Sequence, residues 1–262
     1  MPSSRKVRIA HTSDVHLDGN AVTNSINGYR NVAEAAFAHV VDTVREERCD
    51  LFLVVGDLFD HSRVKLHDID FVCAQFNSLD CQIVVLPGNH DVHDETSVWD
   101  RFDSAKLGSN VHLLLSTEGA RINLEELDLS VWGRAMTEHT PEYRPLQGAP
   151  AKSDLCWNVG LAHGQVVNTE TEYVSSTISE DEIRTSGFDY LALGHVHVWQ
   201  DYQLGNTLAC YPGSPVKAFA TTRGGFFAML TLQDGKVELE KREVPAPATV
   251  EENKHFHFAP GV

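Results

Sequence analysis

Apolar residues in the first 90 positions fall into two patterns that alternate along the chain. Strand-like runs begin near Val7 and recur at 51–55 and 83–86, where hydrophobic residues are continuous. The segments 27–49 and 66–79 between them repeat apolar residues at helical spacing. Continuous hydrophobicity is typical of strands covered on both faces, as in sheets with helical crossovers. We therefore predict strands joined by helices in this part of the chain.

Short strand-like segments replace this alternation from about Val111 onward. Near the end, the Gln-Asp-Gly sequence at 233–235 predicts a tight turn and a closing hairpin. One helix is predicted over 179–187, where Ser179 and Glu182 form a capping-box pattern and a glycine closes the segment. The two parts together predict an α/β fold with two mixed β-sheets.

The sequence predicts one domain over 1–245, followed by a Pro-rich and then polar tail at 246–262. No segment has the apolar core of a secretory signal or the length of a membrane span, so we predict a cytoplasmic protein with no membrane contact. The five cysteines form no CxxC pair and are expected to be free thiols.

The charge of the chain limits the choice of partner. A formal net charge of −16 disfavours DNA, because nonspecific nucleic-acid affinity comes mainly from Lys and Arg. DNA binding would require local positive charge, which metal ions or a basic path would supply. The candidates for such a path are Arg63, Lys65, Arg101, Arg134, Arg144, Lys217 and Arg223. The sequence does not decide the oligomeric state.

Five strand-like segments end in polar clusters that contain many of the 14 histidines. In parallel-rich sheets the carboxyl ends of the strands line the functional edge, so these clusters are expected to converge. Residues one apart in an extended segment point the same way, which would let each DxH or HxH pair face one site. The clusters are Asp14-Val15-His16, Gly56-Asp57 with Asp60, Gly88-Asn89-His90-Asp91, His163-Gly164 and Gly194-His195-Val196-His197.

Each cluster taken alone has a structural explanation. Asp14 could cap a helix, the Pro-Gly-Asn at 87–89 is a turn signal, and His163 could be a hydrogen-bonded core histidine. Four imidazoles, two aspartates and an asparagine amide have no common structural explanation, and together they predict a metal site. Nitrogen and oxygen donors without thiolates suit Mn, Fe, Zn or Ni. Seven donors exceed what one ion takes, so we predict two ions that share Asp57.

The ordered motifs resemble those of the calcineurin-like metallophosphoesterases over about Val7 to Ala218. They are SDVH at 13–16, GDLFD at 56–60, GNHD at 88–91, His-Gly at 163–164 and GHVH at 194–197. Within that family they are most similar to the SbcD-type DNA exonucleases. The resemblance implies a four-layer αββα sandwich with helices on both sides. It also implies one metal ion on Asp14, His16 and His197, a second on Asn89, His163 and His195, and Asp57 between the two.

The same resemblance implies the catalytic residues. His90 is expected to stabilise the transition state or protonate the leaving oxygen, Asp60 to orient His90, and Asp91 to orient a ligand. The ions are expected to be Mn, with Fe or Zn as alternatives, and a hydroxide between them would attack phosphorus. Three nearby histidines are expected to be loop residues without a ligand role: His61, His67 and His93.

Three functions are compatible with these residues. The first is a two-metal phosphodiesterase acting on DNA ends, and the second is a phosphoesterase for a nucleotide or another small substrate, which the acidic balance favours. The third is a non-catalytic scaffold, which the complete set of seven donors argues against. Few residues follow the predicted hairpin, which ends near Val244. This short segment argues against the cap domain of the SbcD-type enzymes and against an SbcC-type ATPase partner.

Overall fold

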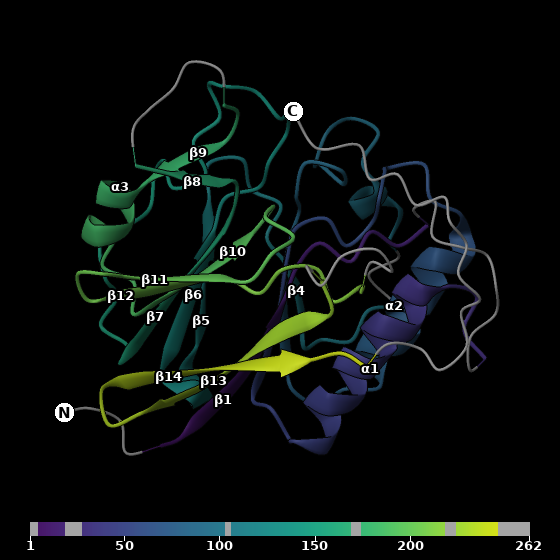
Figure 1. Ribbon diagram of the computed structural model, residues 1–262, viewed down its shortest axis with the longest axis horizontal. Coiled ribbons are helices and arrows are strands. Elements are labelled where there is room, and N and C mark those ends of the chain that lie inside the picture. The colour runs from purple at the N-terminus through teal and green to yellow at the C-terminus, as the bar shows by residue number, and fades with distance from the viewer. Residues whose placement is uncertain (1–4, 19–27, 103–105, 169–173, 218–223, 246–262) are drawn as a thin grey trace.

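Two mixed β-sheets of six strands each pack face to face, with helices on the outer faces (Figure 1). The computed structural model describes residues 5–18, 28–102, 106–168, 174–217 and 224–245. The predicted fold class, two mixed β-sheets flanked by helices, is confirmed. The tail at 246–262 and Arg223 lie outside the described residues.

The first sheet contains the strands predicted from the early apolar runs. Its four parallel strands are β1 (Val7–Thr12), β2 (Leu51–Val55), β3 (Gln82–Leu86) and β4 (Val111–Leu113). The predicted hairpin completes the sheet, with β13 (Phe226–Gln233) antiparallel to β1 and β14 (Lys236–Glu243) at the edge. All five residues of β2 are buried, which agrees with the continuous hydrophobicity of this strand.

The second sheet is built from the later, shorter strands. Its order is β11-β12-β10-β7-β6-β5, and β6, β7, β10 and β12 run parallel. Their bounds are β5 (Ala120–Leu124), β6 (Leu129–Gly133), β7 (Trp157–His163), β10 (Tyr190–Gly194), β11 (Gln200–Leu204) and β12 (Thr207–Tyr211). A separate parallel pair, β8 (Gln165–Val167) and β9 (Thr177–Ser179), follows β7.

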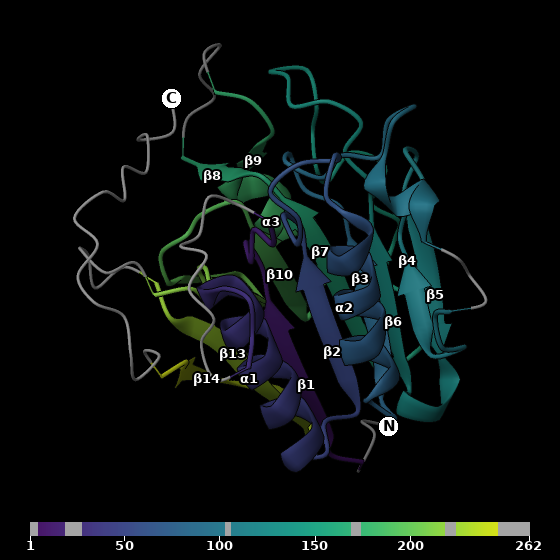
Figure 2. The same ribbon diagram turned by 90° about the vertical axis from the view of Figure 1, so that its right-hand side faces the viewer.

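Helices cover both outer faces of the sandwich. Figure 2 shows α1 (Val32–Glu46) and α2 (Leu66–Asn77) lying over the first sheet. The second sheet is covered by α3 (Glu180–Thr185), which begins with the predicted Ser179 and Glu182 capping box. Two 3-10 helices, η1 (Val98–Arg101) and η2 (Glu125–Leu127), lie in connections.

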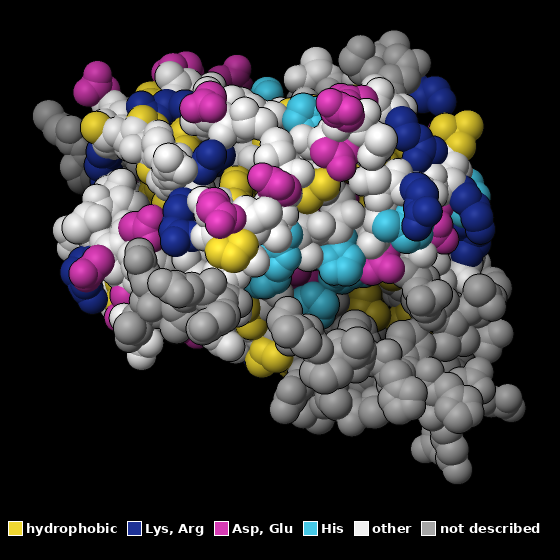
Figure 3. Space-filling model, turned by 90° about the horizontal axis from the view of Figure 1, so that it is seen from above, with side chains coloured by type: hydrophobic (Ala, Val, Ile, Leu, Met, Phe, Trp, Pro, Cys, Tyr) yellow, Lys and Arg dark blue, Asp and Glu magenta, His cyan; other side chains and the backbone are white. Residues whose placement is uncertain are grey.

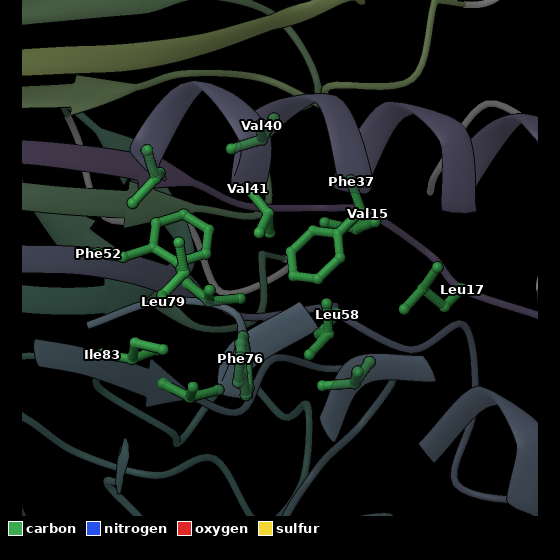
Figure 4. Packing of buried hydrophobic residues seen from close by; sticks show 14 of the residues in the cluster. Val15, Leu17, Phe37, Val40, Val41, Phe52, Leu58, Phe76, Leu79 and Ile83 are labelled. Carbon is green, nitrogen blue, oxygen red and sulfur yellow. The ribbon is translucent and has the colours of Figure 1, made fainter. Parts of the chain in front are cut away.

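The hydrophobic core has a layer between the sheets and a layer on each outer face. Phe37 and Val41 of α1 pack against Phe52 of β2 and Phe76 of α2 (Figure 4). Burying such a side chain contributes roughly 1.5–3 kcal/mol, so this layer fixes both helices on the sheet. The sheets are thereby held rigidly enough to position side chains at their strand ends.

The structure also bears on the cysteines and on membrane-spanning segments. The five cysteines form no disulfide; Cys49, Cys73 and Cys210 are buried, and the other two are partly buried. Among the described helices, none combines the length and apolar character needed to cross a membrane.

Candidate metal centre

The carboxyl ends of β1, β2, β3, β7 and β10 meet at one edge of the sandwich. The imidazole of His163, at the end of β7, hydrogen-bonds the Val55 carbonyl at the end of β2 across 3.1 Å. Looking onto this edge, Figure 3 shows a group of histidines beside acidic side chains. The structure brings all nine predicted site residues to this edge: Asp14, His16, Asp57, Asp60, Asn89, His90, His163, His195 and His197.

A first group of donors combines two segments from different sheets. Nε2 of His16, after β1, lies 3.2 Å from Nε2 of His197, after β10. Oδ1 of Asp14 lies 3.6 Å from the same His197 nitrogen. Three ligand atoms therefore converge where the two sheets meet, within 4.8 Å of one another.

A second group surrounds the amide of Asn89. Its Oδ1 lies 3.0 Å from Nε2 of His163 and 2.9 Å from Nδ1 of His195. His163 is fully buried, whereas His195 is partly exposed. The amide oxygen and the two imidazoles are thus directed at one another from three strand ends.

Asp57 lies between the two groups. Its Oδ2 is 3.8 Å from Nε2 of His16 and 3.3 Å from Nε2 of His163. Burial opposes the negative charge of Asp57, but the neighbouring His163, His16 and His90 outweigh it and hold the pKa of this carboxyl well below its usual range. One buried, ionised carboxylate therefore faces both donor groups.

The backbone at this edge adopts conformations that L residues rarely occupy. Asp14, His16, Asp57 and His195 have φ values of 56°, 53°, 51° and 100°. The prediction that the Asp14 and His16 segment is extended is therefore wrong, although both side chains reach the same site. Such conformations cost of order 1–3 kcal/mol each and concentrate at functional sites. At Gly56, φ +77°, a Cβ would lie 1.9 Å from the His163 ring, so glycine is required there.

His90 and Asp60 lie beside the first donor group. The rings of His90 and His16 are 4.7 Å apart, and Nδ1 of His90 donates to the Asp60 carbonyl oxygen at 2.9 Å. The Asp60 carboxylate hydrogen-bonds Nδ1 of His16 at 2.9 Å and lies 3.6 Å from His90. Asp60 thus contacts His90 mainly through its main chain and His16 through its side chain.

Asp91 connects two of the loops without entering either donor group. Its buried carboxylate accepts hydrogen bonds from the backbone N–H groups of Gly88, Asp57 and Phe59 at 2.7, 3.2 and 3.1 Å. Burial, and then the nearby charge of Asp57, raise its pKa. Asp91 therefore orients the loop backbone that presents Asp57 and Asn89.

Comparison with protein families identifies this arrangement. Residues 7–199 match the family model described as calcineurin-like phosphoesterase. The chain belongs to the calcineurin-like phosphoesterase family. The family predicted from the sequence motifs is confirmed.

Two relatives of this calcineurin-like phosphoesterase illustrate its nearer similarities. It is 28% identical over 225 residues to an uncharacterized metallophosphoesterase, YhaO, from Bacillus subtilis, covering 78% of this chain and 52% of that protein. It is also 28% identical to the DNA double-strand break repair protein Mre11 from Methanopyrus kandleri, covering 91% of this chain and 57% of that protein. The chain thus spans little more than half the length of these curated relatives.

Solved structures share the fold at low sequence identity. A dimetal phosphatase from Danio rerio aligns with a TM-score of 0.58 at 10% identity, covering 90% of this chain and 96% of that one. A purple acid phosphatase, PPD1, from yellow lupin aligns with a TM-score of 0.58 at 15% identity, covering 93% and 52%. These similarities support the two-sheet architecture.

The donor set of this phosphoesterase fits metal ions. Nδ1 of His16 faces the Asp60 carboxylate, and Nδ1 of His163 faces the Val55 carbonyl, so each Nδ1 is the protonated nitrogen. In the neutral form of each ring, Nε2 then presents its lone pair to the space that it shares with the other donors. An acceptor behind a ligating imidazole is the usual way in which proteins fix the tautomer of a metal ligand.

Without an ion, the pKa values of the four donor histidines are shifted in opposite directions. Burial disfavours the charged form of all of them, but carboxylates outweigh it at His16 and His163 and raise the pKa of both. At His195, burial and the nearby His163 lower the pKa to about 4. Burial also lowers the pKa of His197. The edge thus concentrates competing charges in a volume where a cation would be stabilised by the aspartates and by neutral imidazoles.

The three histidines expected to lie outside the site do so. His93 bonds the Leu115 carbonyl through Nδ1, His61 accepts the Arg63 backbone N–H, and His67 is exposed beside Asp68. They belong to none of the ligand groups found among the described residues.

Sequence patterns did not point to two residues that lie next to proposed ligands or hold the loop behind them. The buried hydroxyl of Tyr211 donates to the Gly164 carbonyl at 2.6 Å and accepts from Val166 N–H at 2.9 Å, which fixes the loop after His163. The ring of His139 lies 5.3 Å from that of His195. A tyrosine at the end of an apolar strand and a histidine in a loop carry no local signal of either role.

Proposed function

We propose that the chain is a two-metal phosphodiesterase that acts on DNA ends. The observation that carries the proposal is the placement of Asp57, buried and ionised, between two complete donor groups. Under this proposal one group would hold the first ion and the other the second, with Asp57 shared. The first group is Asp14, His16 and His197, and the second is Asn89, His163 and His195.

The ions we propose are divalent transition metals, with Mn preferred and Fe or Zn as alternatives for the same donors. When bound, such a pair supplies positive charge for phosphoryl oxygens and acidifies the attacking water. The family assignment and the mutual approach of the seven donors support this proposal.

His90 is proposed to act on the leaving oxygen. Its backbone N–H donates to Oδ1 of Asp57 at 2.8 Å, and its Nδ1 donates to the Asp60 carbonyl. The ring is thereby fixed with Nε2 free of any hydrogen bond to a described residue. In the protonated state Nε2 would transfer its proton to the alkoxide as the phosphorus–oxygen bond breaks, while water supplies the new oxygen.

A local group of cations supports DNA as the substrate despite the net charge. Arg63, Lys65 and Arg101 form no ion pair with any described residue, and Arg101 donates to the Ser62 carbonyl, two residues after Asp60. Figure 3 shows Lys and Arg side chains beside the histidines on this face. Unpaired cations next to the catalytic edge provide the phosphate contacts that a polynucleotide requires.

The net charge of −16 favours the second candidate, a phosphodiesterase for a small nucleotide or other diester. A single assay separates the two. Purified protein with Mn²⁺ is incubated with end-labelled linear duplex DNA and, in parallel, with bis(p-nitrophenyl) phosphate. Asp57→Asn serves as the control for contaminating enzymes.

Shortening of the DNA that is lost in Asp57→Asn is the expected result. Turnover of the small diester with intact DNA would overturn the DNA assignment and support the second candidate. Inactivity on both would support a scaffold role. Arg63→Ala with Arg101→Ala should weaken DNA hydrolysis about tenfold and spare the small diester, whereas Arg121→Ala, on β5, should affect neither.

A further inference from the structure

His139 lies at the rim of the centre, next to the second donor group. Its ring is 5.3 Å from that of His195 at an interplanar angle of 67°, and its side chain is exposed. It is close enough to His163, Asp57 and His90 for electrostatic interaction with all three. A side chain in this position borders the same volume as the proposed metal ligands.

The segment that carries His139 is fixed on both sides of the residue. Three positions before it, the Met136 carbonyl accepts from the His93 N–H at 2.8 Å. One position after it, the Thr140 carbonyl accepts from the Ser176 N–H at 3.2 Å. His139 is therefore held at the rim by the fold.

The imidazole nitrogens of His139 form no hydrogen bond with the described part of the chain. Because the side chain is exposed, both ring nitrogens are accessible to a ligand that enters the centre. The arrangement also matches that of His90, which borders the first donor group with its ring 4.7 Å from His16. Each donor group thus has one accessory imidazole beside it.

We propose that His139 is a second substrate-contacting residue, on the opposite flank from His90. A ring N–H of His139 donates a hydrogen bond to a nonbridging oxygen of the phosphoryl group that stays in the product monophosphate. His90 acts on the leaving oxygen, so the two imidazoles hold opposite sides of the reacting phosphate. This inference rests on the proposed phosphodiesterase function.

The test compares His139→Phe, which keeps a ring against His195 but has no donor, with His139→Gln, which keeps an N–H. Binding of thymidine 5′-monophosphate to the Mn-loaded protein is measured by calorimetry, together with KM and kcat for bis(p-nitrophenyl) phosphate and with Mn content. The matched control is His67→Phe, an exposed histidine on α2.

His139→Phe should weaken thymidine monophosphate binding about tenfold and raise KM by a similar factor, with unchanged Mn content. His139→Gln should stay within about threefold of the native protein. Binding by the Phe variant equal to that of the native protein would overturn the proposal. Loss of Mn from the Phe variant would also overturn it, since His139 would then act by supporting His195.

Binding of thymidine monophosphate is measured without turnover. Failure of the phosphodiesterase proposal can therefore be told apart from failure of the proposed His139 contact. A native protein that hydrolyses no diester refutes the phosphodiesterase, while the calorimetric comparison still reports on His139. A native protein that turns over the diester, with all His139 variants unchanged in binding and KM, refutes the substrate contact alone.

Discussion

Two histidines five positions apart, one in the core and one at the edge where the strand ends meet, have opposite environments. His11 in β1 is completely buried, and its Nδ1 lies 2.8 Å from the Tyr190 hydroxyl. Burial lowers its pKa to about 3. His16, just beyond the same strand, is also largely buried, yet the Asp60 hydrogen bond and the charges of Asp57 and Asp14 raise its pKa.

The comparison shows that burial of a histidine does not mark a site. The core histidine has a neutral phenol as its partner and regular strand backbone, so it packs as a neutral ring. The edge histidine has carboxylates for partners and a φ of 53°, a strained conformation. Carboxylate neighbours together with strained backbone distinguish His16 from His11, and the predictions below test the two environments.

Asp57→Asn should have the largest effect, because it removes the charge that both donor groups face. We expect Mn content to fall at both positions and diester turnover to drop by more than about 10³-fold. Metal analysis of the purified variant beside its rate checks this. Retention of two ions per chain would contradict the placement of Asp57 between the groups.

His90→Ala should leave the ions bound and reduce turnover. Removing a group that transfers a proton costs about 10²–10⁴-fold, so kcat should fall in that range with little change in Mn content. The His67→Ala variant controls for loss of an exposed imidazole. An unchanged kcat would refute the role assigned to His90, and loss of metal would place His90 among the ligands.

Sequence could predict the strands and most of the edge. Continuous apolar runs predicted β2 and β3 because both faces of these strands are buried, and the strand ends predicted residues that the structure brings together at one edge. The three-residue strand β9 was not predictable, since its pairing with β8 is fixed by tertiary contacts. Nor was His139, whose position depends on backbone hydrogen bonds of Met136 and Thr140 with distant segments.

Acid should destabilise the protein through His11. Its pKa is about 3 in the folded state and about 6.5 when unfolded, so between these values only the unfolded chain binds the proton. Stability is therefore lost as the pH falls below about 6.5. His11 should contribute a loss of about 2 kcal/mol between pH 7 and pH 5.

Urea unfolding of metal-free protein at both pH values measures this effect in the native chain and in His11→Gln. The variant should lose about 2 kcal/mol less than the native protein, because contributions from the edge histidines are common to both. Equal losses would show that His11 titrates normally in the fold, and the contrast between core and edge would disappear.

Asp60→Asn should have the smallest effect, because an amide oxygen can still accept the hydrogen bond from Nδ1 of His16 but no longer carries charge. We expect affinity for one of the two ions to fall about tenfold while the other is retained. Titration of the metal-free protein with Mn²⁺ distinguishes the two sites.

The matched control is Asp100→Asn, because Asp100 lies 3.4 Å from His93, which is not one of the donors. Equal weakening of both ions would mean that Asp60 supports the whole edge through its backbone, and an unchanged titration would mean that its charge does not reach His16.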